Sequence, residues 1–184
     1  MKLRIAHADD AAAIQAIYAP VVRETATSFE YEAPSADDMA SRIARTLERY
    51  PWLVAEIDGD VAGYAYGGAH RMRTAYQWSV ETSVYVSPAF RKRGVGVAVN
   101  AALLDVLRAQ GFANAFGGIT LPNAASVALH ERLGYVRIGV YRGIGFKLGR
   151  WHDVGWWQRR LIEDDAAPRE PIAIGDVDID AVLK

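Results

Sequence analysis

The sequence contains no cysteine among its 184 residues. This absence excludes disulfide scaffolds, cysteine-ligated zinc, iron–sulfur clusters and thiol nucleophiles. No apolar run reaches the roughly 18 residues of a membrane helix, and the start, MKLRIAHADD, turns polar too early for a signal peptide. Charge of one sign is not in excess, since 21 Lys and Arg balance 22 Asp and Glu. The sequence therefore predicts a soluble, cytoplasmic protein with neither a membrane nor a nucleic-acid partner.

The composition is that of an ordinary globular domain, with 51% hydrophobic and 23% charged residues. At about 150 residues per domain, the length predicts one domain with a short appendage. Residues 163–184 hold seven acidic and two basic residues, whereas the remainder holds 15 acidic and 19 basic ones. We therefore expect a domain over residues 1–162 and a partly ordered acidic tail over 163–184. That tail is either a frayed end or a strand docked on a partner.

Strands and helices are mixed along the chain and do not alternate strictly. Apolar patterning and an Asp-Gly turn predict strands at residues 3–6, 52–57, 61–66, 78–87, 115–120, 136–141 and 152–161. Capping residues and helical spacing predict helices at about 9–22, 35–47, 96–110 and 123–133. This order favours an α+β fold with a mixed sheet over a doubly wound parallel sheet.

A glycine-rich turn joins the strand at 78–87 to the next helix. Residues 91–96 read RKRGVG, which places two glycines and three bases at a helix N-terminus. Free N–H groups and the helix dipole bind phosphate oxygens at such a position. A Rossmann fingerprint fails because Val99 stands where the motif needs its third small residue, and the sequence has no Walker motif. A simple turn with a solvated basic cluster is the alternative.

The strand before this turn carries polar side chains on one face. Its apolar positions are Trp78, Val80, Thr82, Val84 and Val86, and they alternate with Ser79, Glu81, Ser83 and Tyr85. The apolar set predicts the core side, and the polar set predicts a side that is solvated or faces a cleft. Because the polar face ends at the basic turn, a ligand held there would lie along Glu81.

The helix at 123–133 contains a histidine of ambiguous role. Asn123 is a typical N-cap and Gly134 a typical terminating residue. His130 and Glu131 lack the second histidine of a zinc metalloprotease motif, so we expect no metal. A lone histidine on such a helix is more often structural than catalytic. Farther along, Trp151, Trp156 and Trp157 form a cluster typical of a core or an interface.

Four segments in order resemble the GNAT superfamily of acetyl-CoA-dependent N-acetyltransferases. The turn at 91–96 is similar to its pyrophosphate loop, and residues 123–135 are similar to its later cofactor segment. Residues 76–86 and 149–158 resemble the phosphinothricin and methionine sulfoximine acetyltransferase branch. The similarity covers residues 2–161. It implies the α+β GNAT (acyl-CoA N-acyltransferase) fold, a mixed, mostly antiparallel sheet flanked by helices, with a splayed central strand pair.

The resemblance also implies sites for acetyl-CoA and for a small-molecule amine. The loop amides that would clamp the CoA pyrophosphate are those of Arg91, Lys92, Arg93, Gly94, Val95, Gly96, Val97 and Ala98. The other groups implied to contact acetyl-CoA are the backbone of Val84, Tyr85 and Val86, together with Asn123 and Ser126. The substrate groups of the branch fall on Arg71, Arg73, Tyr76, Ser83, Tyr85, Thr120, His130 and Val154.

Glu81 is the candidate general base, because an α-ammonium group has to lose a proton before it can attack a thioester. His130 is a candidate second base. Attack would give a tetrahedral oxyanion near the backbone N–H of Val86, and Arg71 and Arg73 would pair with a carboxylate or phosphinate. The expected reaction is direct acetyl transfer to the α-amine of phosphinothricin, methionine sulfoximine or methionine sulfone.

The chain departs from the branch at three positions, because other members carry Lys, Thr and Gly where it has Arg71, Ser83 and Thr120. Two alternatives stay open: an acetyltransferase for a polyamine or a protein N-terminus, and a non-catalytic acyl-CoA sensor. The two arginines argue against a polycation, and Glu81 argues against a sensor. The resemblance and the tryptophan cluster predict a homodimer. The resemblance, which covers residues 2–161, offers no counterpart for the acidic tail.

Overall fold

The computed structural model describes residues 1–163 and 167–183. Three of the residues counted in the charge of the tail lie outside the described residues: Asp164, Asp165 and Lys184. The strands are β1 (Lys2–Ile5), β2 (Trp52–Ile57), β3 (Asp60–Ala69), β4 (Ser79–Val86), β5 (Asn114–Leu121), β6 (Val136–Lys147) and β7 (Arg150–Arg160). The α-helices are α1 (Ala11–Glu24), α2 (Ala36–Leu47), α3 (Val95–Gln110), α4 (Ala124–Arg132) and α5 (Ile179–Val182). Short 3-10 helices are η1 (Ala8–Asp10), η2 (Thr74–Tyr76), η3 (Pro88–Phe90) and η4 (Ile174–Asp176).

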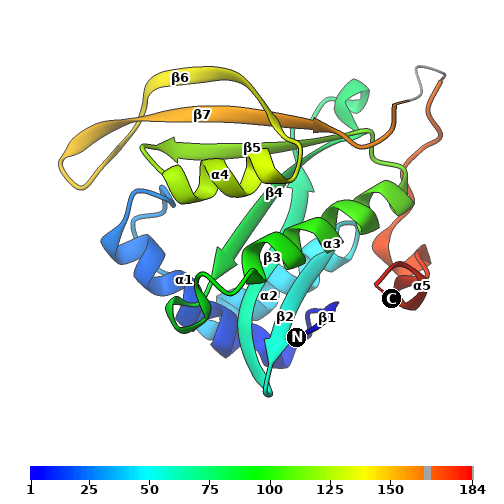
Figure 1. The fold of residues 1–184 in the computed structure, drawn as a ribbon, viewed down its shortest axis with the longest axis horizontal. Helices are drawn as coiled ribbons and strands as arrows, with labels where there is room; N and C mark the ends of the chain where they lie inside the picture. The colour runs from blue at the N-terminus through cyan, green and yellow to red at the C-terminus, as the bar shows by residue number, and fades with distance from the viewer. Residues whose placement is uncertain (164–166, 184) are drawn as a thin grey trace.

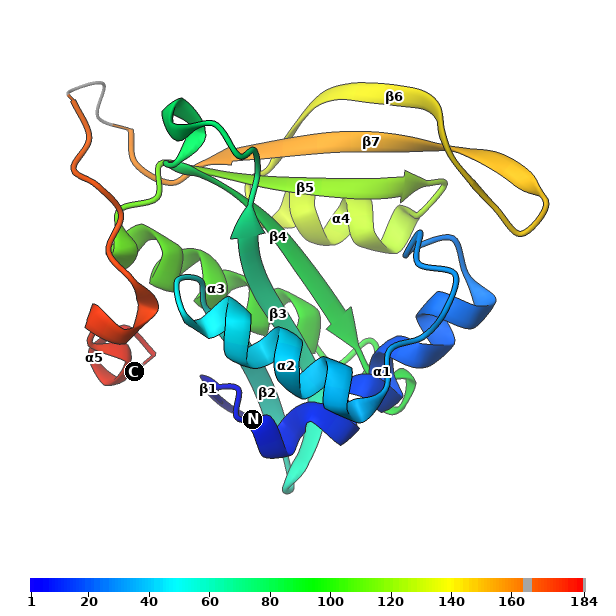
Figure 2. The same cartoon turned by 180° about the vertical axis from the view of Figure 1, so that it is seen from behind.

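The strands form one sheet in the order β1-β2-β3-β4-β5-β7-β6. All neighbours are antiparallel except β4 and β5, which are parallel. Helices α3 and α4 lie in front of the sheet in Figure 1, and α1 and α2 lie in front of it in the reverse view of Figure 2. The prediction of an α+β fold with a mixed, mostly antiparallel sheet between helices is confirmed.

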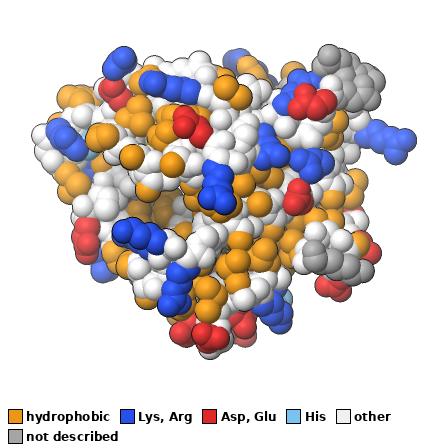
Figure 3. Space-filling model, viewed as in Figure 1, with side chains coloured by type: hydrophobic (Ala, Val, Ile, Leu, Met, Phe, Trp, Pro, Cys, Tyr) orange, Lys and Arg blue, Asp and Glu red, His pale blue; other side chains and the backbone are white. Residues whose placement is uncertain are grey.

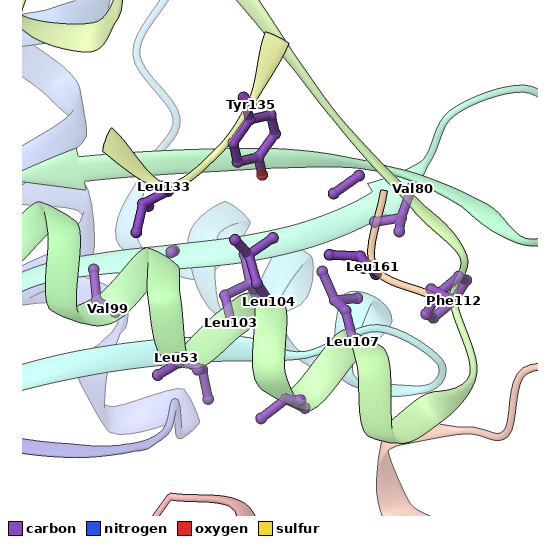
Figure 4. Packing of buried hydrophobic residues seen from close by; sticks show 14 of the residues in the cluster. Leu53, Val80, Val99, Leu103, Leu104, Leu107, Phe112, Leu133, Tyr135 and Leu161 are labelled. Atoms are coloured by element: carbon purple, nitrogen blue, oxygen red, sulfur yellow. The ribbon is translucent and has the colours of Figure 1, made fainter. Parts of the chain in front are cut away.

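Each face of the sheet has its own core. On one face, α3 packs Leu103, Leu104 and Leu107 against β2 and β4, as Figure 4 shows. On the other face, α1 and α2 pack against Trp52, Val54 and Tyr64. Of the predicted tryptophan cluster, Trp157 is buried, Trp156 is half-buried and Trp151 is exposed. Only Trp151 therefore presents most of its ring to solvent.

The two central strands separate after a short contact. β4 and β5 pair only from Ser79 to Glu81, opposite Asn114 to Phe116. β4 continues beside β3 as far as Val86, and β5 continues beside β7 as far as Leu121. Each strand thus keeps a partner on its outer side while a slot opens between them. The expected splay of the central pair is present, and it is visible in Figure 1 between β4 and β5.

The last two strands are longer than the sequence predicted. β6 extends to Lys147 and β7 begins at Arg150, so they form a hairpin closed by Leu148 and Gly149, both with positive φ. The pairing of β6 with β7 shifts register twice, between Arg137 and Gly139 and between Tyr141 and Gly145. These irregularities break the apolar alternation, which explains why the pattern predicted only residues 136–141.

The C-terminal segment forms no strand in the part that the structure describes. It folds as η4 and α5 at the end of α3, as Figure 1 shows. The N–H of Ile172 donates to the Gln110 carbonyl at 2.9 Å, and Gln110 Nε2 donates to the Ile172 carbonyl at 2.8 Å. Ile174 is buried in the core, and Trp78 Nε1 donates to the Arg169 carbonyl. The described part of the tail is therefore docked on this chain.

Candidate active site

The slot between β4 and β5 is a cleft lined by several of the predicted site residues. Its walls are formed by Thr27, Thr82, Ser83, Val84, Tyr85, Gly118, Ile119, Thr120, Asn123, Ser126 and His130. Asn123 is held at the start of α4, where its side chain accepts from the N–H of Ser126 at 3.1 Å. Figure 3 shows a hollow on the face that carries α3 and α4, with Lys and Arg side chains beside it.

The basic turn lies at the N-terminus of α3. Gly94 is its N-cap in a left-handed conformation with φ 79°, and a side chain there would meet no atom within 4 Å. The backbone N–H groups in the first turn of α3, after Gly94, have no hydrogen-bond acceptor within the helix. Arg91, Lys92 and Arg93 are exposed. This donor set fits an anionic group such as a pyrophosphate.

Gly96 has a different reason for being glycine. A side chain at this buried position would approach Leu129 within 2.8 Å and Val86 within 3.2 Å. Gly96 therefore lets α3 approach α4 and β4 closely, while Gly94 is the glycine open to solvent. Val95 is buried, and Val97 and Ala98 are half-buried, so the predicted loop contributes mainly backbone groups at its helical end.

Glu81 has a partner that the sequence analysis missed. His70, at the end of β3, donates from Nδ1 to Glu81 Oε1 at 3.0 Å. The His70 ring stacks on Phe116 at 4.2 Å between centroids, and the edges of Tyr76 and Trp156 close around it. The antiparallel pairing of β3 with β4 places Gly68 opposite Glu81, and this brings His70, two residues farther along, within reach of the same carboxylate. A sequence alone does not fix this register.

The side chains on the polar face of β4 differ in their surroundings. The Glu81 side chain is 38% exposed. Tyr85, at the other end, lies under α1 with its ring 5.1 Å from that of Tyr18. Burial raises the pKa of Tyr85 well above its usual value, so its hydroxyl stays protonated. The predicted solvated or cleft-facing side therefore holds for both residues: Glu81 is partly exposed, and Tyr85 is half-buried and lines the slot.

His130 lies on the other face of the sheet from Glu81. Glu81 pairs with Phe116, whereas the His130 ring packs on the next residue, Gly117, whose substituents point to the opposite face. His130 Nδ1 donates to the Ser126 carbonyl at 2.8 Å. Burial lowers the pKa of His130, so the ring is neutral at pH 7. The two predicted acid–base residues are thus not brought together.

The predicted amine-binding residues fall into two groups. Thr120 and Val154 are neighbours across β5 and β7, and Ser83 and Tyr85 line the slot. Arg71, Arg73 and Tyr76 are exposed on the loop before β4. Of these, Arg71 reaches Tyr141, with Nη2 3.5 Å from the hydroxyl. The loop residues therefore stand at the rim of the site on the Glu81 face.

Within residues 1–163 and 167–183, no cluster of three or more His, Cys, Asp or Glu could hold a metal ion. In the same part of the chain, no helix is both long and apolar enough to cross a membrane.

Comparisons with known proteins agree with this geometry. The family model described as "Acetyltransferase (GNAT) domain" matches residues 3–156. A phosphinothricin N-acetyltransferase of Streptomyces viridochromogenes is 43% identical over 92% of both chains. A methionine sulfoximine/methionine sulfone acetyltransferase of Salmonella typhimurium is 38% identical over 91% of this chain and 98% of its own.

A solved structure gives the same result. The phosphinothricin acetyltransferase of Sinorhizobium meliloti, in complex with AcCoA, superposes with a TM-score of 0.88 and 38% identity, over 93% of this chain and 94% of its own. The family match covers most of the chain and includes β4, the basic turn and α4. The chain therefore belongs to the GNAT acetyltransferase family, in the branch of the phosphinothricin and methionine sulfoximine acetyltransferases.

Proposed function

We propose that the chain transfers the acetyl group of acetyl-CoA to the α-amine of a small amino-acid analogue of the phosphinothricin or methionine sulfoximine type. The observation that carries this proposal is the slot between β4 and β5. The N-terminus of α3, which fits an anion, lies beside Val84 and Val86, and a carboxylate, Glu81, lies at the strand pair from which the slot opens. The names of the relatives support the choice of acceptor.

Acetyl-CoA fits the slot as the acetyl donor, because it supplies both a pyrophosphate and an activated thioester. The amides at the start of α3 and the exposed bases 91–93 would hold its pyrophosphate. Val84 and Val86, on the stretch of β4 without a β5 partner, would bind the extended pantetheine arm. Asn123 and Ser126 line the slot beside that arm.

Glu81 is the proposed general base for the amine. An ammonium group has no lone pair, so it attacks a thioester carbonyl only after losing a proton. Attack would place negative charge on the carbonyl oxygen, which a backbone N–H near Val86 would stabilise, before CoA leaves as the thiol. His130, neutral and on the opposite face from Glu81, would then contact the substrate from the α4 side.

The acceptor site would use the rim arginines. Arg71 and Arg73 are exposed guanidinium groups, which form bidentate pairs with a carboxylate or a phosphinate. A second acceptor, a protein N-terminus, is favoured by the ribosomal-protein-alanine N-acetyltransferase of Brucella melitensis. That structure is 32% identical, with a TM-score of 0.84 over 87% of this chain and 99% of its own. The positive rim disfavours a polyamine.

We also propose a homodimer through the β6–β7 hairpin. Its exposed apolar side chains are Val136, Ile138, Tyr141, Ile144, Phe146, Leu148 and Trp151. So many large apolar groups on one hairpin are typical of an interface. Light scattering at micromolar concentration checks this, and a monomer would contradict it. The cytoplasmic location stays a prediction.

The test of the reaction is CoA release, measured with a thiol reagent. The chain has no cysteine, so the reagent detects only the product. The acceptors are methionine sulfoximine, phosphinothricin, spermidine and a peptide with N-terminal alanine. We expect activity on the first two, lowered about 100-fold or more in Glu81→Gln and unchanged in Glu48→Gln, an exposed glutamate at the end of α2.

Other outcomes would overturn parts of the proposal. Activity on spermidine or on the peptide alone would reject the acceptor and keep the donor. Binding of acetyl-CoA without turnover of any amine would indicate a sensor.

A further inference from the structure

The imidazole of His70 is fixed against Glu81 by its surroundings. Its side chain is 13% exposed, against 38% for Glu81. Phe116 of β5 stacks on the ring, with an angle of 10° between the planes, and Trp156 of β7 meets it edge-on. Turning the ring away from Glu81 would break this stack. The hydrogen bond is therefore a built feature of the site.

The other titratable and charged groups near the pair lie at its rim. Tyr76, on the loop before β4, meets the His70 ring edge-on. Tyr141 of β6 lines the same pocket as His70, and Arg71 reaches the Tyr141 hydroxyl. β5 and β7 contribute the apolar rings of Phe116 and Trp156. Among the described residues, Glu81 is thus the only carboxylate in ion-pair contact with His70.

We propose that His70 and Glu81 act together as one base, with the proton held on the imidazole. This inference rests on the proposed function. A carboxylate alone is a poor store for a proton near neutral pH, since carboxyl groups as a class ionise about two pH units below imidazoles. An imidazole matches the working pH better. The adjacent carboxylate stabilises the imidazolium that forms.

The proton balance is simple. An N–H bond of the substrate ammonium breaks, and its electron pair stays on nitrogen as the lone pair that attacks the thioester. Glu81 takes up that proton first. Because Nδ1 of His70 already carries the hydrogen donated to Glu81, the proton passes through water to the free lone pair on Nε2, which leaves a carboxylate and an imidazolium. When the tetrahedral intermediate collapses, the C–S bond breaks and the second proton of the attacking nitrogen goes to the thiolate, so CoA leaves as the thiol. The imidazolium releases its proton to water before the next cycle. His70 would thus act through Glu81, as a positioning and proton-storing residue.

Three variants test whether His70 stores a proton or only holds Glu81 in place. His70→Asn keeps an N–H donor close to the position of Nδ1 but cannot take up a proton. His70→Phe keeps the stack on Phe116 and removes the donor, so it covers the case in which the asparagine variant fails to fold. His7→Asn, at an exposed histidine near the N-terminus, is the matched control.

The kinetic test compares kcat and KM for methionine sulfoximine over pH. We expect both His70 variants to lower kcat about 10-fold or more with little change in KM. In His70→Asn the acid side of the kcat/KM profile should move down by about one pH unit or more, toward the range of a lone carboxylate. Wild-type kcat and an unmoved profile in His70→Asn would overturn the proposal.

A spectroscopic test needs no turnover. The ring tautomer follows the hydrogen bond that each nitrogen makes, so ¹⁵N spectra of the histidines should show His70 protonated at Nδ1. We expect this signal to change in Glu81→Gln, and loss of the signal in His70→Asn assigns it. If the wild-type enzyme is active and the His70 signal is the same in Glu81→Gln, only the pairing of His70 with Glu81 is overturned. If the wild-type enzyme is inactive on every amine, the proposed function is overturned.

Discussion

A methyl group on Gly117 of β5 would lie 2.7 Å from Cδ2 of the His130 ring on α4. The ring cannot retreat easily, because it is buried and its Nδ1 is bonded to the Ser126 carbonyl at 2.8 Å. The ring also makes an edge-to-face contact with Tyr135, with centroids 5.0 Å apart. The position of His130 beside the slot therefore depends on the absence of a side chain at residue 117.

Gly117→Ala is expected to displace His130 and to lower the free energy of unfolding by about 1–3 kcal/mol, because the added carbon overpacks a closed contact. Urea denaturation checks the stability. Gly139→Ala is the control on β6, where a side chain would meet nothing within 4 Å, and its change should stay within about 0.5 kcal/mol. Equal stability of the two variants would contradict the packing argument.

Gly94→Ala is expected to raise the KM for acetyl-CoA several-fold, because the residue caps the proposed pyrophosphate site with φ 79°. The matched control is Gly59→Ala in the turn between β2 and β3. That residue has φ 90° and, like Gly94, would meet no neighbouring atom. Both changes should cost about 1–2 kcal/mol of backbone strain. A KM unchanged in Gly94→Ala, or raised equally in both variants, would argue against a pyrophosphate at this turn.

His130 is expected to make stability depend on pH. Burial lowers its pKa from 6.5, so the unfolded chain takes up this proton first as the pH falls. The contribution of neutral His130 to the free energy of unfolding is therefore complete above about pH 6.5, and it declines as the pH falls toward the pKa of the folded state. Urea denaturation at about pH 7.5 and about pH 5.5 should show a larger loss for wild type than for His130→Gln. Equal losses would contradict the shift.

Lys147→Met is expected to loosen the segment between α1 and α2. The buried Lys147 Nζ donates to the carbonyls of Val22 and Ser28, each at 2.6 Å. Losing both bonds should lower the free energy of unfolding by about 1–3 kcal/mol. It should also raise the KM values for acetyl-CoA and for the amine, because Thr27 of this segment lines the slot.

Lys2→Met, at an exposed lysine on β1, is the control for Lys147→Met. A variant at position 147 with wild-type stability and wild-type KM values would show that the two carbonyls do not need the ammonium group.

Local chemistry made part of the fold predictable. Ser35 begins α2 by accepting from the N–H of Asp38, and Asn123 begins α4 in the same way. Gly111 and Gly134 end α3 and α4 with positive φ. These signals act over three or four residues, so a sequence displays them directly.

Features that join distant residues were not predictable in the same way. The pairing of His70 with Glu81 depends on the register of β3 against β4. The docking of the tail depends on Gln110 meeting Ile172, which is 62 residues away. Trp157 is buried where β7 pairs with β5, whereas the exposed Trp151 lies beyond Asp153, the last residue of β7 that pairs with β5. Such contacts are set by packing in three dimensions, which local propensity does not encode.

The short pairing of β4 with β5 has a consequence for hydrogen exchange. β4 is the middle strand of seven, yet beyond Glu81 it has a neighbouring strand only on its β3 side. Its backbone N–H groups that point into the slot should exchange with solvent deuterium as fast as those of a strand at the rim of a sheet. Those bonded to β3 should stay protected. The centre of this sheet thus behaves as an edge, ready to accept one more extended chain.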